Sequence, residues 1–184
     1  SLNTRGKVAF TMDPVRVGDV GCGATSGIYL ENSKKFDAFD IVACSDLRLE
    51  AAEARAKEYD IPKAYTTDDL LADPDVEVAI NLTPHLAHGP VGIQILEAGK
   101  HLYSEKPFAV HMEDARRMID LAERKGLRIG CAPDTFFGGA WQTARKLIDE
   151  GVIGKPVAAF SNLHARIAPR PTPSNQKGTG EYVS

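Results

Sequence analysis

The sequence contains no apolar run long enough to cross a bilayer, and no charged segment followed by an apolar core stands near its first residues. Its formal net charge is only -3, which provides no basic surface for nucleic acid or for anionic lipid. We therefore expect a cytoplasmic protein that has neither a nucleic-acid partner nor a membrane partner.

Cysteine is scarce, with Cys22, Cys44 and Cys131 scattered along the chain and no Cys-x-x-Cys motif. This pattern fits a reducing compartment and excludes a disulfide framework, and we interpret the three as small core residues. His85 and His88 stand three residues apart, but no carboxylate or thiolate is spaced to complete a metal site with them. We predict no metal.

The 184 residues are enough for one well-packed domain and the start of a second, with the 43% hydrophobic and 26% charged content of an ordinary globular protein. Residues 1–14 are expected to be a poorly ordered lead-in, left from expression or processing. Residues from about 169 to 184 are rich in Pro, Gly, Ser and Thr, which is typical of a flexible tail.

Between these ends, short apolar runs alternate with helix-forming segments. This order predicts an α/β fold, a Rossmann-type doubly wound parallel sheet. Expected strands are 16–20, 39–45, 76–82, 101–104 and 127–131, and expected helices are 26–35, 49–59, a short one from 67, 85–98, 112–125 and 136–150. The last helix should turn Leu147 and Ile148 inward, and 155–167 reads as a longer strand.

A glycine-rich turn follows the first expected strand. A dinucleotide-binding unit places Gly-x-Gly-x-x-Gly here, so that backbone N–H groups at the start of the next helix can approach a pyrophosphate. Gly21 and Gly23 fill the first two positions, Ser26 takes the third, and Gly27 comes one residue late. We predict cofactor contacts at Gly21, Gly23, Ala24, Thr25 and Ser26. A turn that binds no ligand is the alternative.

Asp46 stands at the end of the second expected strand, where an acid accepts hydrogen bonds from the ribose hydroxyls of adenosine and repels a 2′-phosphate. It favours NAD over NADP. Nearby Arg48 is the counter-signal, because a guanidinium could hold that phosphate. A cap on the following helix is the alternative role for Asp46.

Thr83, Pro84, His85 and His88 stand where the next strand meets its helix, at an edge of the sheet that lines the ligand crevice in such folds. We predict that they form a polar lining of the cofactor crevice. The alternative is that they are ordinary residues at the start of a helix.

Glu105, Lys106 and Pro107 follow the next strand and should face the same crevice. A lysine beside a nicotinamide can orient a substrate hydroxyl and stabilise negative charge on its oxygen, so Lys106 is the candidate catalytic residue and Glu105 a candidate cofactor contact. A cis bond before the proline would aim the lysine. A surface Glu-Lys pair is the alternative.

In this order along the chain, the motifs resemble those of the Gfo/Idh/MocA oxidoreductases, the relatives of glucose-fructose oxidoreductase and inositol dehydrogenase. The resemblance covers about residues 15–160 and includes Thr83-Pro84-x-x-x-His88, Ala98-Gly99-Lys100-His101-Leu102 and Leu147-Ile148-x-x-Gly151-x-Ile153-Gly154. It implies an NAD(P)-binding Rossmann domain at 15–154, with Lys106 at the nicotinamide and a sugar, polyol or related hydroxyl compound as substrate. NAD is the expected cofactor and NADP the alternative.

The resemblance also implies a second α+β domain with a mostly antiparallel sheet, which supplies an Asp-x-x-x-His acid/base and the interface of a homo-oligomer. Residues 155–184 would be its beginning, and none of the five histidines here has an Asp four residues earlier. A truncated NAD(P)-dependent oxidoreductase and a non-catalytic NAD(P)-binding sensor are both open. His85 replaces the family's usual Asn, and Asp19 interrupts a strand that is normally apolar. Because burying a carboxylate without a partner is costly, Asp19 either has a partner or marks a weak spot.

Overall fold

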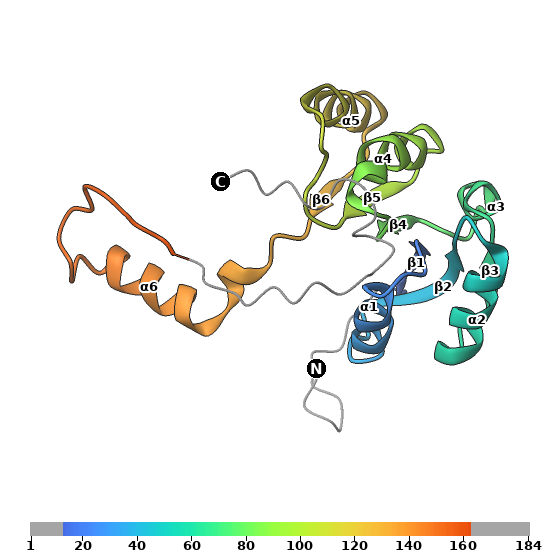
Figure 1. The fold of residues 1–184 in the computed structure, drawn as a ribbon, viewed down its shortest axis with the longest axis horizontal. Helices are drawn as coiled ribbons and strands as arrows, with labels where there is room; N and C mark the ends of the chain where they lie inside the picture. Colours follow the sequence, from blue (N-terminus) through green and yellow to red (C-terminus); the bar gives the residue numbers. More distant parts are fainter. Residues whose placement is uncertain (1–12, 163–184) are drawn as a thin grey trace. The chain divides into compact units, whose positions relative to one another are not determined.

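The computed structural model describes residues 13–162, whose strands and helices alternate along the chain (Figure 1). The described strands form one sheet in which all six are parallel, in the order β3-β2-β1-β4-β5-β6. They are β1 (Val15–Val20), β2 (Phe39–Ser45), β3 (Lys63–Tyr65), β4 (Val78–Asn81), β5 (His101–Ser104) and β6 (Ile129–Cys131). The prediction of a doubly wound Rossmann sheet is confirmed.

Helices cover both faces of the sheet. On one face, α1 (Ser26–Ser33) and α2 (Leu49–Tyr59) pack over a small core that contains Leu30, Ala52 and Ala56. On the other face, α3 (Thr67–Ala72), α4 (His88–Glu97) and α5 (Met112–Lys125) bury a larger core. Its most buried members include Leu70, Ile95, Leu96 and Met118.

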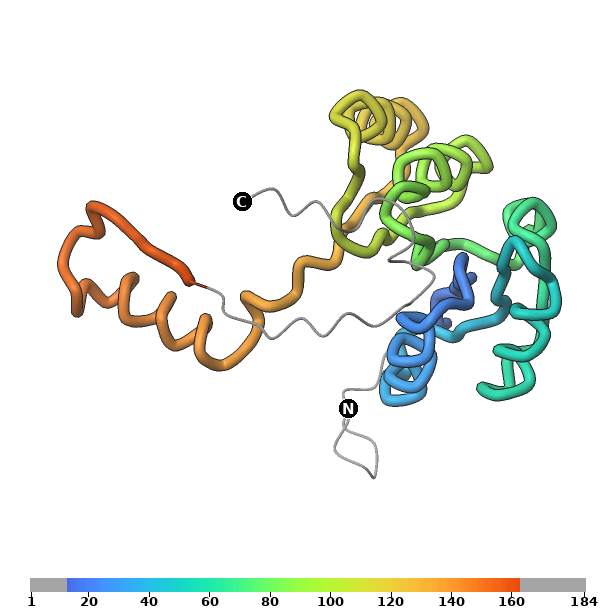
Figure 2. The backbone as a smooth tube through the Cα atoms, in the orientation of Figure 1, coloured from blue at the N-terminus to red at the C-terminus, as the bar shows by residue number. Residues whose placement is uncertain are grey.

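The path of the chain creates a point where the strand order reverses. The backbone starts at β1 in the middle of the sheet, moves outward to β3, and then crosses back to β4 on the other side of β1 (Figure 2). Ligands of open parallel sheets bind outside the carboxyl ends of the strands at such a reversal. The fold therefore directs attention to the carboxyl ends of β1 and β4.

Glycines follow the ends of three helices. Gly99, Gly126 and Gly151 have φ angles of +80°, +66° and +70°, the left-handed conformation in which a residue without Cβ carries no steric penalty.

The sequence-based prediction lacked one strand and made some of the others too long. The three-residue β3 was not predicted, because Lys63–Tyr65 is too short to show an alternating pattern. The helix expected from His85 begins at His88, since His85–Ala87 form a separate 3-10 turn. Residues 155–162 of the expected long strand do not form a strand, and the remainder of that segment lies outside the described residues.

The contacts divide the chain into a unit that ends at Pro133 and another that begins at Asp134, whereas the sequence-based boundary was at 154. The second unit contains a 3-10 turn at Thr135–Phe137 and α6 (Gly139–Asp149). Within its described part, no element covers the apolar side of α6. Leu147 and Ile148 are therefore 39% and 41% exposed, and the prediction that they face inward was wrong. The assignment of 15–154 and 155–184 to two domains stays a prediction.

Candidate functional site

The glycine-rich turn after β1 packs directly against the end of β4. Gly21 has a φ of +111°, and a Cβ added to it would lie 2.8 Å from the carbonyl carbon of Leu82. Its N–H donates to the carbonyl of Ser45 on β2 (2.8 Å). Conformation and space both require glycine here, because the turn fills the gap between the ends of β2 and β4.

Gly23 has the opposite environment. It is exposed, and no described atom lies within 4 Å of the position that a Cβ would take. Packing within the described chain therefore does not explain this glycine, whereas close approach of a ligand to the backbone does. Ala24 and Thr25 beside it are exposed as well.

Ser26 fills the third position of the glycine pattern. It is fully buried, and its Oγ donates to the carbonyl of Gly23 (2.8 Å), which closes the turn at the start of α1. Gly27 serves the packing of α1 on α2, because a Cβ there would lie 3.0 Å from the hydroxyl of Tyr59. The two residues thus share the role that one glycine has in the usual pattern.

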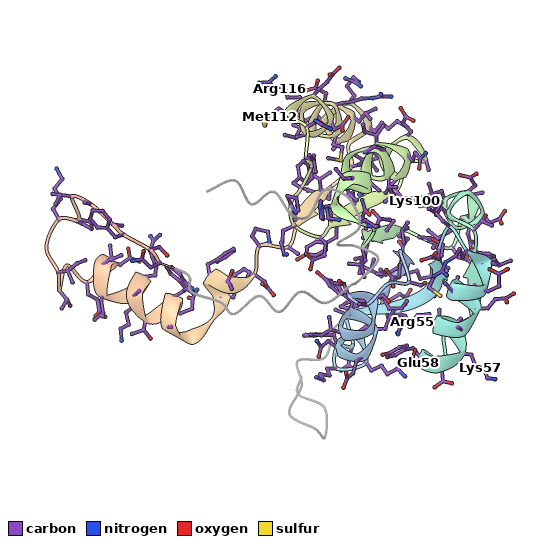
Figure 3. All side chains as sticks on the ribbon, in the orientation of Figure 1. Arg55, Lys57, Glu58, Lys100, Met112 and Arg116 are labelled. Carbon is purple, nitrogen blue, oxygen red and sulfur yellow. The ribbon has the colours of Figure 1, made fainter. Side chains whose placement is uncertain are left out.

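An arginine on α2 holds the glycine-rich turn through hydrogen bonds. The Arg55 guanidinium donates to the carbonyls of Gly23 (3.0 Å) and Cys22 (3.4 Å), and it lies over the Tyr59 ring. Figure 3 shows Arg55 on the side of α2 that faces α1, whereas Lys57 points outward. The sequence analysis missed Arg55, although it shares a helical face with Ala52 and Ala56, an unusual place for a charge.

Asp46 joins the end of β2 to the glycine-rich turn. Its Oδ2 accepts the N–H of Cys22 (3.0 Å) and its Oδ1 accepts the N–H of Arg48 (3.0 Å). The carboxylate is therefore held in place by two backbone groups and keeps lone pairs for further donors. It does not cap α2, whose start has no side-chain cap among the described residues.

A buried amide organises the end of β4. Asn81 Oδ1 accepts the hydroxyl of Thr83 (2.6 Å) and Asn81 Nδ2 donates to the carbonyl of His88 (3.1 Å). Thr83, Pro84 and His85 are half-buried or exposed above it, at the edge where the sequence placed them.

His88 lies beneath this edge rather than in it. The side chain is only 1% exposed, and its ring nitrogens contact two backbone carbonyls, Nδ1 that of Pro107 (2.6 Å) and Nε2 that of Thr83 (2.7 Å). Burial thus corrects the expectation that His88 lines the crevice directly, and removes it from any metal site with His85. Within residues 13–162, no group of three or more His, Cys, Asp or Glu side chains could hold a metal ion.

The Glu105–Lys106–Pro107 turn follows β5, and its Lys106–Pro107 bond is cis, as hypothesised from the sequence. The Glu105 carboxylate accepts the hydroxyl of Tyr29 from α1 (2.8 Å) and the N–H of Lys106 (2.8 Å). Lys106 itself is exposed. Tyr29, which the sequence analysis missed, therefore connects the helix after the glycine-rich turn to the turn that carries the lysine.

Asp19 lies in β1 two residues before Gly21 and is 1% exposed. Among the described residues, neither of its carboxylate oxygens has a hydrogen-bond partner. Burial, and then the neighbouring Cys22, raise the pKa of Asp19 well above its usual range, although Arg55 opposes the shift. Of the two alternatives for Asp19, the described residues supply no partner, so this carboxyl group marks a weak spot at which burial opposes the charged form.

The cysteines are free thiols, with Cys22 and Cys44 buried and Cys131 half-buried. The Cys44 thiol beside it, together with burial, raises the pKa of the Cys22 thiol. Burial also raises the pKa of Cys131. Raised pKa values at Cys22 and Cys131 are those of packed thiols, whereas the hydrogen bond with Cys22 lowers the pKa of Cys44.

The described part of the chain holds no helix with the length and apolar character needed to cross a membrane.

Comparison with known proteins agrees with this geometry. Residues 15–132 match a family model described as an oxidoreductase family with an NAD-binding Rossmann fold. The chain is 34% identical to trans-1,2-dihydrobenzene-1,2-diol dehydrogenase of Mus musculus, over 76% of this chain and 43% of that protein. It is 30% identical to 1,5-anhydro-D-fructose reductase of Ensifer adhaerens, over 78% of this chain and 44% of that protein.

A solved structure shares both fold and sequence. The WlbA dehydrogenase from Bordetella pertussis, crystallised with NADH and UDP-GlcNAcA, superposes with a TM-score of 0.73 at 27% identity. The match covers 79% of this chain and 42% of that one. The chain thus spans less than half the length of the relatives that it matches.

Proposed function

Since the chain belongs to this family, the Gfo/Idh/MocA oxidoreductases with an NAD-binding Rossmann fold, we propose that the turns at the carboxyl edge of its sheet bind NAD(H) for a dehydrogenase. The observation that supports this most directly is Gly23, an exposed glycine that no described contact requires. The residues present fit the cofactor along its whole length.

The pyrophosphate would lie at Gly23 and the start of α1. That helix has no acidic residue in its first turn, and its first residues have no side-chain cap among the described residues. Its N-terminal N–H groups and the positive end of its dipole are therefore available to an anion. Gly23, Ala24 and Thr25 leave this surface open, which supports the predicted cofactor contacts at these positions.

The adenosine would lie beyond β2. Asp46 is oriented by two backbone N–H groups and would accept both ribose hydroxyls, while its charge would repel a 2′-phosphate. Next to it, Leu47 is 97% exposed and offers an apolar surface to the adenine ring. This arrangement favours NAD, and the exposed Arg48 is the feature that would admit NADP.

The nicotinamide, which supplies or accepts hydride when it is bound, would lie between the Thr83–Pro84 turn and Lys106. The ammonium group of Lys106 would hold the reacting hydroxyl of the substrate and stabilise the charge that develops on its oxygen. Glu105, fixed by Tyr29, sets the backbone on which Lys106 stands. Lys106 is thus the proposed catalytic residue of this chain.

The substrate class rests on the relatives. The most similar proteins include a dihydrodiol dehydrogenase, an anhydrofructose reductase and a myo-inositol dehydrogenase of Thermotoga maritima. All three names describe oxidation or reduction at hydroxyl-bearing carbon or its ketone. We extend this to a sugar, polyol or related hydroxyl compound, and propose a homo-oligomer located in the cytoplasm.

Calorimetric titration of NAD and of NADP into the 184-residue chain tests the proposal. We expect NAD to bind more tightly than NADP, and Asp46→Ala to lower NAD affinity about tenfold, since the charge-assisted bonds to the ribose are lost. Asp46→Asn, which keeps the shape and one acceptor oxygen, should lose less. Asp40→Ala, an exposed aspartate near the opposite end of β2, is the matched control. Wild-type chain that binds neither nucleotide contradicts the proposal.

A further inference from the structure

We propose that His88 is a positioning residue that fastens the lysine-bearing turn after β5 to the turn after β4, through one imidazole N–H donated to each. The inference rests on the proposed function, because it concerns the nicotinamide half of the same site. It gives a buried side chain a specific task in placing Lys106, which His88 does not touch.

The two ring contacts define the task. Nδ1 lies 2.6 Å from the carbonyl oxygen of Pro107, and Nε2 lies 2.7 Å from the carbonyl oxygen of Thr83. Carbonyl oxygens only accept hydrogen bonds, and a neutral imidazole has a single N–H to donate. Both contacts are hydrogen bonds only when both ring nitrogens carry a proton, and the proposed clamp is this doubly donating arrangement.

The backbone of His88 is anchored independently of its ring. The carbonyl of His88 accepts the Nδ2 amide of Asn81, and Asn81 Oδ1 accepts both the hydroxyl and the N–H of Thr83. Asn81 is fully buried in β4. The ring therefore extends from the start of α4, which Asn81 of β4 anchors, to the residue that directly follows Lys106.

Acidic and basic groups surround the ring on several elements. Asp114 of α5 packs against Gly89, the next residue along the chain, and Glu105 lies on the turn that the ring holds. His85 precedes it in the 3-10 turn, and Lys106 carries the opposing positive charge.

The hydrogen bonds of this clamp end on the nicotinamide half of the proposed site. The glycine-rich turn and Asp46 have hydrogen bonds of their own, from Gly21 to Ser45, between Cys22 and Asp46 and from Arg55 to Gly23. Loss of the ring should therefore release the turn of Lys106 while the adenosine and pyrophosphate contacts persist. A general loss of folding would instead weaken both halves together.

The first test is the protonation of the ring itself. The imidazole nitrogens of the full 184-residue chain are labelled with ¹⁵N, and the His88 signals are assigned as those missing in His88→Gln. We expect both His88 nitrogens to appear as protonated N–H at pH 7, with or without nucleotide. One protonated and one bare nitrogen would overturn the two-bond clamp.

The second test separates the two ends of the cofactor. NADH and ADP-ribose, which lacks the nicotinamide, are titrated into wild type, His88→Phe and His88→Gln, with His111→Phe as an exposed-histidine control. We expect His88→Phe to weaken NADH about tenfold with ADP-ribose unchanged, and His88→Gln, which retains an N–H donor, to recover part of the loss.

Equal loss of both ligands, or unchanged NADH affinity in a folded His88→Phe, would overturn the positioning role. Wild-type chain that binds neither ligand would overturn the proposed function and the nicotinamide role with it. In that case the ¹⁵N spectrum still shows whether both ring nitrogens of His88 carry the protons that the two-bond clamp needs.

Discussion

Asp19 makes the stability of this domain depend on pH in a direction opposite to that of most carboxylates. Its pKa in the folded chain is raised by burial above the value it has in the unfolded chain. Once the pH exceeds the unfolded value, near 4, the unfolded chain releases this proton while the folded chain keeps it. The folded state then binds one proton more, and stability falls as the pH rises.

The magnitude follows from that one proton. Between the unfolded and the folded pKa of Asp19, each pH unit lowers the folding equilibrium constant tenfold, which amounts to about 3 kcal/mol over two units. Asp19→Asn cannot ionise and has nearly the same shape. It should be close to wild type in stability near pH 4, and its advantage should grow with pH until the pH passes the pKa of Asp19 in the folded chain.

Urea unfolding of wild type and Asp19→Asn at intervals from pH 4 to pH 8 measures the difference, in which all other titrating groups cancel. Asp40→Asn, an exposed residue on the neighbouring strand β2, controls for the loss of one negative charge. A constant difference between wild type and Asp19→Asn across the range would refute the argument, because it would mean that Asp19 titrates alike in both states.

Three further outcomes are expected. Arg55→Ala should lower NADH affinity about tenfold by freeing the carbonyl of Gly23, with partial recovery in Arg55→Lys; equal affinities in titration would count against it. Gly21→Ala should destabilise the chain by about 3 kcal/mol or more in urea unfolding, because its Cβ meets backbone, whereas Gly23→Ala should leave stability unchanged and weaken only NAD binding. The hydrogen bond from Lys63 lowers the pKa of Asp73, so its stabilisation is present above the unfolded pKa and lost as pH falls. Asp73→Asn should therefore lower Tm by several degrees at pH 7 and by less at pH 3, and equal losses at both would contradict this.

The sheet could be predicted because each of its central strands is a short apolar run followed by a recognisable turn or helix start. Phe39–Ser45 and Leu49–Tyr59 have the predicted bounds in the structure. The strand β3 escaped prediction because three residues that end at the sheet edge carry no periodicity. The exact ends of helices depend on tertiary contacts that residue spacing does not reveal. One example is the 3-10 turn before α4, where His88 contacts the carbonyl of Thr83.

The candidate site was predictable where its chemistry lies in local motifs, as at Gly21, Asp46 and Lys106. It was not predictable where the residues act across elements. Arg55 and Tyr29 reach the site from helices, and the one local signal is the position of the Arg55 charge on the apolar face of α2. The burial of His88 likewise depends on the β5 turn, which lies nineteen residues further along the chain.

The central claim is that NAD lies across the carboxyl ends of β1, β2 and β4, and an amide NMR footprint tests it most directly. Spectra of the ¹⁵N-labelled chain are recorded as NAD is added. The account predicts shifts concentrated at Gly21–Ser26, Asp46, Thr83 and Lys106. Saturable binding whose shifts cluster elsewhere, for example around Phe36 and Phe39 at the opposite end of β2, would contradict it.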